Sequence, residues 1–230
     1  MEASLAQKRV LITSGPTRAN LDAVRYIGNR STGRLGCRIA REALRRGARV
    51  ILLAGPESAL PERRDLSADE WSRLRVVSIE TVEDLMKALH RELTSPEPPG
   101  AVVHAMAVLD YAPDAASTEK TPSGRDEWHV RLVRTPKVIN HIREWAPRAY
   151  LVQFKLEVRL SEEQLKEAAL ASLRSNRADL VVANDQTRIR DEAHPALILA
   201  PDGTVLARPS TKDEIARALC DLLAARRAAE

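Results

Sequence analysis

One stretch decides the fold, residues 8–18, which read Lys8-Arg9-Val10-Leu11-Ile12-Thr13-Ser14-Gly15-Pro16-Thr17-Arg18. Its short apolar run with β-branched members is typical of a strand buried on both faces of a parallel sheet, and it stops at glycine and proline. The loop that follows is rich in glycine and hydroxyl groups and ends in Gly28-Asn29-Arg30-Ser31-Thr32-Gly33-Arg34-Leu35-Gly36. A strand, such a loop and a helix together present backbone N–H groups to an anion. We therefore predict an anion-binding loop after the first strand.

Strand and helix patterns alternate along the rest of the chain. A helix is expected after the loop, with Gly47 in a C-cap position, and the next strand is expected over residues 49–54. Further strands are predicted over residues 74–79, 101–108, 150–156 and 180–183, and helices are predicted to start at Thr81, Thr135, Ser161 and Thr211. A strand, a crossover helix and a further strand imply a right-handed connection and a parallel sheet.

Three other segments have different patterns. Residues 56–73 are rich in proline, serine and charge, so they are expected to loop over the surface. Residues 128–134 alternate like a half-exposed strand, and Pro201-Asp202-Gly203 forms the turn of a hairpin between residues 196–200 and 204–208. The predicted fold class is α/β: a Rossmann-like, doubly wound, mostly parallel sheet with flanking helices and an extra β-hairpin near the C-terminus.

Length and composition limit the possible classes of protein. The 230 residues fit one domain over residues 1–230, with residues 1–7 as a flexible N-terminus and residues 112–127 as a mobile loop. Aromatic residues make up only 3% of the chain, which is unfavourable for a protein that stacks nucleic-acid bases. The net charge of +4 fits either a solvated, arginine-rich surface or attraction of an anion such as a nucleoside triphosphate.

The cysteines and the hydropathy pattern indicate the cellular compartment of the protein. Cys37 and Cys220 lie far apart within expected helices, and their spacing does not match that of metal ligands. We therefore expect them to be buried residues of a protein in a reducing environment. No apolar run reaches the ~18 residues of a membrane span. We therefore expect a cytoplasmic protein that contacts neither membrane nor nucleic acid.

Polar residues follow three of the predicted strands. They are the Asn29 loop, Asp110 with Lys120 beyond it, and Asn184-Asp185. In a doubly wound sheet these strand ends share one edge, so the residues are expected to converge on one cleft. The first loop has neither the G-x-G-x-x-G of dinucleotide-binding proteins nor the Gly-Lys-Ser/Thr of a P-loop, which argues against a plain NAD-dependent dehydrogenase.

Several motifs resemble one family in its own order over nearly the whole chain. They are Leu11-Ile12-Thr13-Ser14-Gly15-Pro16-Thr17-Arg18, Asp22-Ala23-Val24-Arg25-Tyr26-Ile27-Gly28-Asn29-Arg30-Ser31-Thr32-Gly33, His104-Ala105-Met106-Ala107-Val108-Leu109-Asp110-Tyr111, Glu119-Lys120, Arg134-Thr135-Pro136-Lys137-Val138-Ile139, Phe154-Lys155-Leu156-Glu157 and Val182-Ala183-Asn184-Asp185. Together they resemble phosphopantothenoylcysteine synthetase of coenzyme A biosynthesis, in the stand-alone bacterial form that lacks a flavin-dependent decarboxylase domain.

The resemblance implies a phosphopantothenate–cysteine ligase. In that reaction 4′-phosphopantothenate and L-cysteine are joined by an amide bond through an acyl-nucleotide, and a nucleoside triphosphate is cleaved to its monophosphate and pyrophosphate. The family implies CTP in preference to ATP, Mg²⁺ bound mainly through the nucleotide phosphates, no flavin, and a homodimer. Forming the acyl-nucleotide first divides one difficult step into two easier ones.

The resemblance also assigns site residues. Asn29 and Lys120 are the expected catalytic residues, Asn29 against the substrate and Lys120 on the mobile loop. The expected substrate-binding set is Arg25, Asn29, Met106, Ala107 and Asp110, with Arg25 reaching a neighbouring subunit. The expected nucleotide-binding set is Gly15, Ser31, Gly33, Gly36, Asp110, Lys120, Pro136, Lys137, Val138, Ile139, Phe154 and Asn184.

Some alternatives stay open at this point. His104 lies on a buried-looking strand, where a hydrogen-bonded core histidine is commoner than an acid or base, so it is not in the catalytic set. Phe154 is nearly as well explained as a core residue, and Asn184 as a strand-end hydrogen-bonding group. Rival functions are an NADP-binding oxidoreductase on the same sheet, a nucleic-acid-binding module, and a regulatory homologue that binds nucleotide without turnover.

Overall fold

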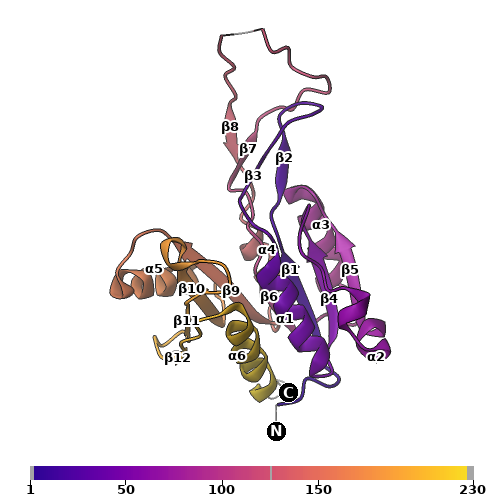
Figure 1. Ribbon diagram of the computed structural model, residues 1–230, viewed down its shortest axis with the longest axis vertical. Helices are drawn as coiled ribbons and strands as arrows, with labels where there is room; N and C mark the ends of the chain where they lie inside the picture. Colours follow the sequence, from indigo (N-terminus) through magenta and orange to yellow (C-terminus); the bar gives the residue numbers. More distant parts are fainter. Residues whose placement is uncertain (1–2, 125, 227–230) are drawn as a thin grey trace.

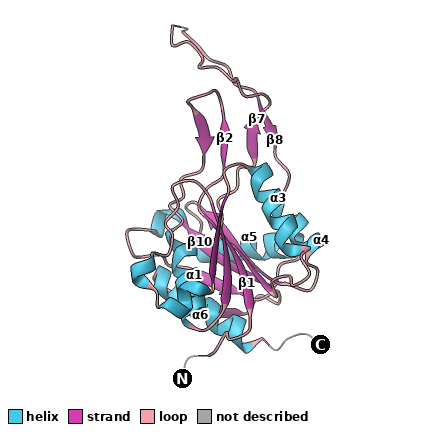
Figure 2. Ribbon diagram, turned by 90° about the vertical axis from the view of Figure 1, so that its right-hand side faces the viewer, coloured by secondary structure: helices cyan, strands magenta, loops and turns pink. Residues whose placement is uncertain are grey.

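The computed structural model describes residues 3–124 and 126–226, and a twisted sheet with helices on both faces forms its centre (Figures 1 and 2). The strands of this sheet are, in spatial order, β12 (Val205–Ala207), β11 (Leu197–Leu199), β10 (Leu180–Asp185), β9 (Tyr150–Glu157), β6 (Ala101–His104), β1 (Arg9–Ser14), β4 (Arg49–Ala54) and β5 (Leu74–Ser78). All neighbours from β10 to β5 are parallel, and β11 and β12 form the antiparallel hairpin at one edge. The predicted fold class is confirmed.

Helices cover both faces because the central strands are apolar on both sides. Within β1, Leu11 packs into one apolar cluster, and Val10 and Ile12 pack into the other. The first cluster is covered by α3 (Val82–Leu93), α4 (Val138–Trp145) and α5 (Glu162–Ser175), and the second is covered by α1 (Arg34–Arg45) and α6 (Lys212–Ala225). The sheet is therefore the middle layer of three.

Side-chain caps fix several helix starts where the sequence predicts them. Thr81, Ser161 and Thr211 each accept a hydrogen bond from a backbone N–H of the first turn of α3, α5 and α6. Such caps satisfy amides that have no partner within the helix. The expected surface loop over residues 56–73 is wrong in part, because it contains a 3₁₀ turn (Arg63–Asp65) and the short helix α2 (Ala68–Ser72), which Ser67 caps.

Other boundaries differ from the expected ones. The strand expected over residues 101–108 forms ladder pairs only to His104, and the strand expected over residues 128–134 is only β8 (Leu132–Arg134). Helix α4 begins at Val138 and not after Thr135, because the Thr135 hydroxyl donates to the carbonyl of Leu109 and so caps no helix.

Two arms project beyond the carboxyl ends of the parallel strands (Figures 1 and 2). The first arm, residues 16–31, contains the antiparallel pair β2 (Arg18–Asn20) and β3 (Tyr26–Gly28), so the predicted simple loop is wrong there. The second arm, residues 111–124 and 126–134, contains β7 (Tyr111–Pro113), which pairs with β8. Neither pair joins the central sheet.

The first and last described segments lie against each other at the end of the sheet opposite the arms (Figure 1). The Lys8 ammonium donates to the carbonyls of Leu223, Ala224 and Arg226. Within the N-terminal stretch expected to be flexible, Leu5 is fully buried and its amide bonds to the carbonyl of Arg46, whereas Ala6 and Gln7 are exposed and Met1 and Glu2 lie outside the described residues. Over residues 3–124 and 126–226, no helix has both the length and the apolar character needed to cross a membrane.

Candidate functional site

The candidate site lies where the chain order along the sheet reverses. From β1 the chain moves outward through β4 to β5 and then returns to β6, on the other side of β1. Beyond these strands the two loops run side by side: the amide of Ala107 donates to the carbonyl of Gly15 over 2.8 Å, and the amide of Thr17 donates to the carbonyl of Ala107 over 3.1 Å. Ligands of open α/β sheets bind in the crevice at this switch point.

A glycine cradle lies on the β1 side of the crevice. Gly15 and Gly33 have positive φ angles of 82° and 67°, which favour glycine. The Ser14 hydroxyl donates to the carbonyl of Gly33 over 3.0 Å, and a Cβ at Gly36 would lie 2.2 Å from the Ser14 oxygen, so these residues pack too closely for larger side chains. Gly33 is also the N-cap of α1 and supplies no side-chain cap, so the first-turn amides of α1 can donate to an anion.

Asn29 connects the first arm to the loop after β6. Its Nδ2 atom donates to the carbonyls of Ala107 and Val108, over 3.3 and 3.1 Å, and the residue is exposed. It does not cap α1, whose N-cap is Gly33. Ser31, which is half-buried, follows on the same segment, and its amide bonds to the carbonyl of Asn29. Asn29 therefore lies with Ala107 at the switch point.

A buried carboxylate joins the two arms. Asp22 is 3% exposed and accepts hydrogen bonds from the amides of Val24, Arg25 and Thr121. The guanidinium of Arg25 pairs with the same carboxylate over 2.9 Å and donates to the carbonyl of Thr121 over 3.3 Å. These donors outweigh the effect of burial and lower the pKa of Asp22 to about 2. Arg25 is thereby placed beside the segment that carries Lys120, which is exposed.

Asp110 and Lys137 lie together on the far side of the crevice. The ammonium of Lys137 is 3.1 Å from a carboxylate oxygen of Asp110, and the amide of Thr135 donates to the Asp110 carbonyl. Pro136 is exposed, but Val138 and Ile139 are 2% and 6% exposed, so their side chains belong to the core. A ligand at this position can meet them only through the backbone.

Three other predicted residues are buried or half-buried. Met106 is 8% exposed and packs in the apolar cluster under α3 and α4, and half-buried Phe154 packs against the cluster under α1 and α6. Asn184 is buried, and its Nδ2 lies 2.9 Å from Nε2 of His194. No hydrogen bond or ion pair in the described part of the chain joins Phe154 or Asn184 to the other predicted site residues.

Two residues at the switch point are absent from the predicted set. The Thr17 hydroxyl accepts from the amide of Leu109 over 2.9 Å, and the Thr13 hydroxyl is 2.8 Å from Nδ1 of buried His104. Burial, with the charge of Lys137, lowers the pKa of His104 to about 4, so the imidazole is neutral near pH 7. The sequence signal for the two threonines is their position, Thr13 at the end of β1 and Thr17 just beyond it. Asp22 is the third missed residue, and its partners in the second arm are too distant in sequence to reveal it.

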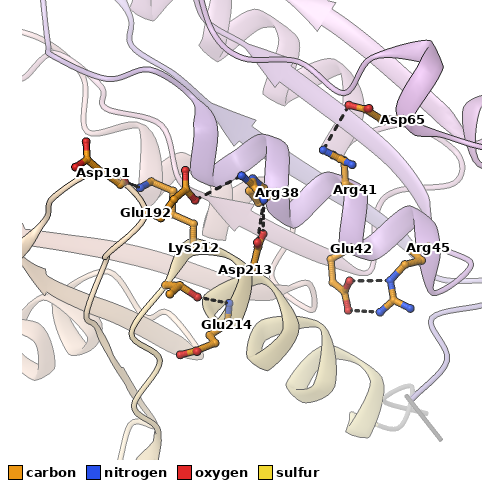
Figure 3. Close-up of polar contacts among 11 residues, drawn as sticks. Arg38, Arg41, Glu42, Arg45, Asp65, Asp191, Glu192, Lys212, Asp213 and Glu214 are labelled. Carbon is orange, nitrogen blue, oxygen red and sulfur yellow. Dashed lines mark hydrogen bonds and ion pairs between the residues drawn. The ribbon is translucent and has the colours of Figure 1, made fainter.

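A second group of charges lies away from the predicted site, on α1, on the start of α6, on the 3₁₀ turn that ends at Asp65 and on the loop that carries Glu192 (Figure 3). Some of its members line a hollow of about 280 Å³. There Arg38 pairs with Asp213 and Glu192, and Arg41 pairs with Asp65, so acidic groups balance these arginines. None of the predicted site residues lines this hollow, and its paired charges serve to join the helices.

The chain matches known proteins over almost its whole length. Residues 5–226 match the family described as the DNA/pantothenate metabolism flavoprotein C-terminal domain. The coenzyme A biosynthesis bifunctional protein CoaBC of Thermococcus kodakarensis is 36% identical over 218 residues, which are 95% of this chain and 51% of that protein. The chain thus spans about half the length of this relative.

Two solved structures have the same fold. The DNA/pantothenate metabolism flavoprotein from Streptococcus pneumoniae superposes with a TM-score of 0.82 and 29% identity, covering 94% of this chain and 98% of that one. The C-terminal domain of a coenzyme A biosynthesis bifunctional protein CoaBC gives a TM-score of 0.74 and 28% identity, covering 96% and 95%. With its sequence match and its switch-point crevice, this chain belongs to the family of DNA/pantothenate metabolism flavoprotein C-terminal domains.

Proposed function

We propose that the chain is a phosphopantothenate–cysteine ligase of coenzyme A biosynthesis, in one ligase domain over residues 1–230. The observation that carries the proposal is the position of Asn29, which donates to the carbonyls of Ala107 and Val108 beside the uncapped N-terminus of α1. One crevice thus combines an amide side chain with an anion cradle. Family membership and the motif resemblance support the same activity.

The reaction has two balanced steps. A carboxylate oxygen of 4′-phosphopantothenate attacks the α-phosphorus of the nucleotide, and pyrophosphate leaves. The amine of L-cysteine then attacks the acyl carbon, the nucleoside monophosphate leaves, and the nitrogen loses a proton as the amide forms. Both steps concentrate negative charge, so donors placed in advance around the reacting groups lower the barrier.

The residues divide between the two substrates. The cradle of Gly15, Gly33 and Gly36, with Ser31, holds the nucleotide phosphates, because the first-turn amides of α1 point out of it without a side-chain cap. Asn29 contacts the substrate carboxylate and the acyl group, since an amide both donates and accepts. Arg25 contacts the substrate phosphate.

The remaining assignments follow the edges of the crevice. Asp110 binds nucleotide and substrate, and Lys120 neutralises charge as the second arm closes. Backbone groups of residues 136–139 and the Phe154 ring contact the base. Met106 and Asn184 would act from buried positions, Met106 through its backbone.

Magnesium fits this site as an ion that binds together with the nucleotide. In the described residues no three or more His, Cys, Asp or Glu side chains are grouped to hold a metal. Mg²⁺ commonly uses one or two carboxylates together with substrate phosphates. The exposed carboxylate of Asp110 is suited to this role, and a bound Mg²⁺ would supply charge neutralisation at the phosphates.

A homodimer in the cytoplasm belongs to the same proposal. The arms expose large apolar side chains, with Tyr26, Tyr111 and Trp128 each more than a third exposed, and a second copy would cover them. Cys37 and Cys220 are free and buried, as is typical of a reducing compartment. Sedimentation at the mass of one chain would contradict the dimer.

The test is pyrophosphate release from 4′-phosphopantothenate, L-cysteine and Mg²⁺ with either CTP or ATP. We expect release that depends on phosphopantothenate and is faster with CTP. Equal or higher rates with ATP would overturn the nucleotide assignment, and no release with either nucleotide would overturn the ligase. An NADPH titration followed by fluorescence is a further check, since saturable binding would favour an oxidoreductase.

A further inference from the structure

His104 uses only one of its two ring nitrogens within the protein. The residue ends β6 at the switch point and is 9% exposed. Its Nδ1 lies 2.8 Å from the hydroxyl of Thr13 on β1. No described side chain or backbone group bonds to Nε2.

Thr13 determines which ring nitrogen carries the proton. Its hydroxyl is fully buried, accepts a hydrogen bond from the amide of Met106 over 3.3 Å, and has no acceptor other than Nδ1 of His104 in the described part of the chain, so we infer that its own proton points to His104. Nδ1 of His104 is then the acceptor, and the proton of a neutral imidazole lies on Nε2. Burial and the nearby Lys137 charge keep the ring neutral near pH 7, since they lower its pKa to about 4.

The free N–H of His104 belongs to the crevice and not to the sealed core. In the described part of the chain, the fully buried side-chain polar atoms without a partner are Ser58 Oγ and His194 Nδ1, and Nε2 of His104 is not among them. The charge of Lys137, the N-cap residue of α4, acts on the ring, and Met106 and Val138 share one apolar cluster. Nε2 is therefore not sealed within the core, and the ring lies near enough to Lys137 to feel its charge.

The charges around this position favour an uncharged partner. Lys137, the cation whose charge acts on the ring, is already paired with Asp110 over 3.1 Å, so the two charges offset each other. A phosphate would be attracted instead to the glycine cradle and the uncapped end of α1. A neutral N–H donor suits a carbonyl oxygen, a ring nitrogen or a hydroxyl oxygen.

We propose that His104 is a further nucleotide-binding residue of this site, which donates its Nε2–H to an uncharged acceptor on the base or ribose of the bound nucleotide. Thr13 is the positioning residue that holds the ring in this tautomer. The inference rests on the proposed function for the identity of the ligand as a nucleotide. An unpaired donor in a largely buried position costs free energy that the ligand removes on binding.

The direct test is nitrogen NMR of the ¹⁵N-histidine-labelled protein. The His104 signals are identified by their loss in His104→Gln, and exposed His90 at the end of α3 serves as an internal control. In the free protein we expect the neutral tautomer with the proton on Nε2. Addition of CTP, ATP or the corresponding monophosphate should shift the Nε2 signal, whereas inorganic pyrophosphate alone should leave it in place.

Variants provide a second test. His104→Leu should raise the KM for the nucleotide about tenfold, as expected for one lost hydrogen bond, with little change in the KM for cysteine. His104→Gln keeps an N–H donor and should restore most of the nucleotide affinity. Thr13→Val should produce a mixture of tautomers, and Thr13→Ser should restore a single one.

Several outcomes would overturn the proposal. They are an Nε2 signal that no nucleotide moves, a signal that pyrophosphate alone moves, or a His104→Leu enzyme with unchanged nucleotide KM. If a variant fails to fold, as thermal melting would show, the NMR titration of the unmodified protein still decides. Loss of the ligase assignment would appear separately, as nucleotide-dependent shifts without pyrophosphate release.

Discussion

The carboxylate of Asp22 accepts a hydrogen bond from the amide of Thr121 over 3.1 Å and so joins two arms that are 99 residues apart in sequence. Asp22→Asn should loosen the second arm, because it removes the charge that attracts Arg25 and replaces one acceptor oxygen with a donor. We expect faster hydrogen exchange over residues 114–124 and turnover reduced about tenfold. An Asp114→Asn variant is the control, since its exposed pair with Arg131 lies in the same arm.

Asn29 and Lys120 should affect different half-reactions. Asn29→Asp cannot donate to the carbonyls of Ala107 and Val108 and places a negative charge beside them. We expect acyl-nucleotide formation to fall by about 10²-fold, the scale for loss of a donor to a developing charge. Lys120→Gln should instead let the intermediate accumulate, seen as pyrophosphate release without amide product.

Lys87→Gln is a matched control for the lysine variant. Lys87 is exposed on α3, where it pairs with Glu83. Full activity in both Asn29→Asp and Lys120→Gln would show that the site is assigned to the wrong residues.

Gly36→Ala should damage the cradle. A new Cβ would lie 2.2 Å from the Ser14 hydroxyl oxygen and 3.3 Å from Ser14 Cα, so β1 and α1 must separate. We expect the free energy of unfolding to fall by about 1–3 kcal/mol, as for other overpacked sites, and nucleotide affinity to fall with it. Gly100→Ala is the control, because its Cβ would meet nothing within 4 Å. Equal melting temperatures for the two variants would contradict the close packing.

Acid should destabilise the protein through two buried histidines. The pKa values of His104 and His194 are each lowered to about 4, chiefly by burial, from an ordinary value of 6.5. Between these values the unfolded chain binds more protons than the folded one, so stability falls as the pH drops from about 6.5 to about 4. The loss approaches about 1.4 kcal/mol per pH unit for each histidine. Urea unfolding at several pH values measures this slope, and His194→Gln should reduce it. An unchanged slope in that variant would show that His194 is not responsible.

The sequence alone predicts the central sheet and the helix layers on its two faces, because consecutive residues of the central strands are apolar. Val10, Leu11 and Ile12 are apolar on both faces, as burial in a parallel strand requires, and helix starts such as Thr81 have a capping side chain. The arms could not be predicted in the same way. Strands of three residues that pair only with each other bury too few side chains to produce a recognisable hydrophobic pattern in the sequence.

The same contrast applies to the site. The glycines and Asn29 are recognisable because their sequence motif is local. The link from Asp22 to Thr121, and that from Thr13 to His104, depend on tertiary geometry that no spacing in the sequence encodes. The shortened strand β6 has a related cause, since after His104 the chain bonds to Gly15 and Thr17, where glycine and proline interrupt the neighbouring strand.

The contact of Lys8 with the carbonyls of Leu223 and Ala224 has an architectural consequence. It holds the start of β1 against the end of α6, at the end of the sheet opposite the two arms (Figure 1). Because these segments lie at the opposite end of the sheet, neither of them covers the crevice between the arms, which stays open to small molecules.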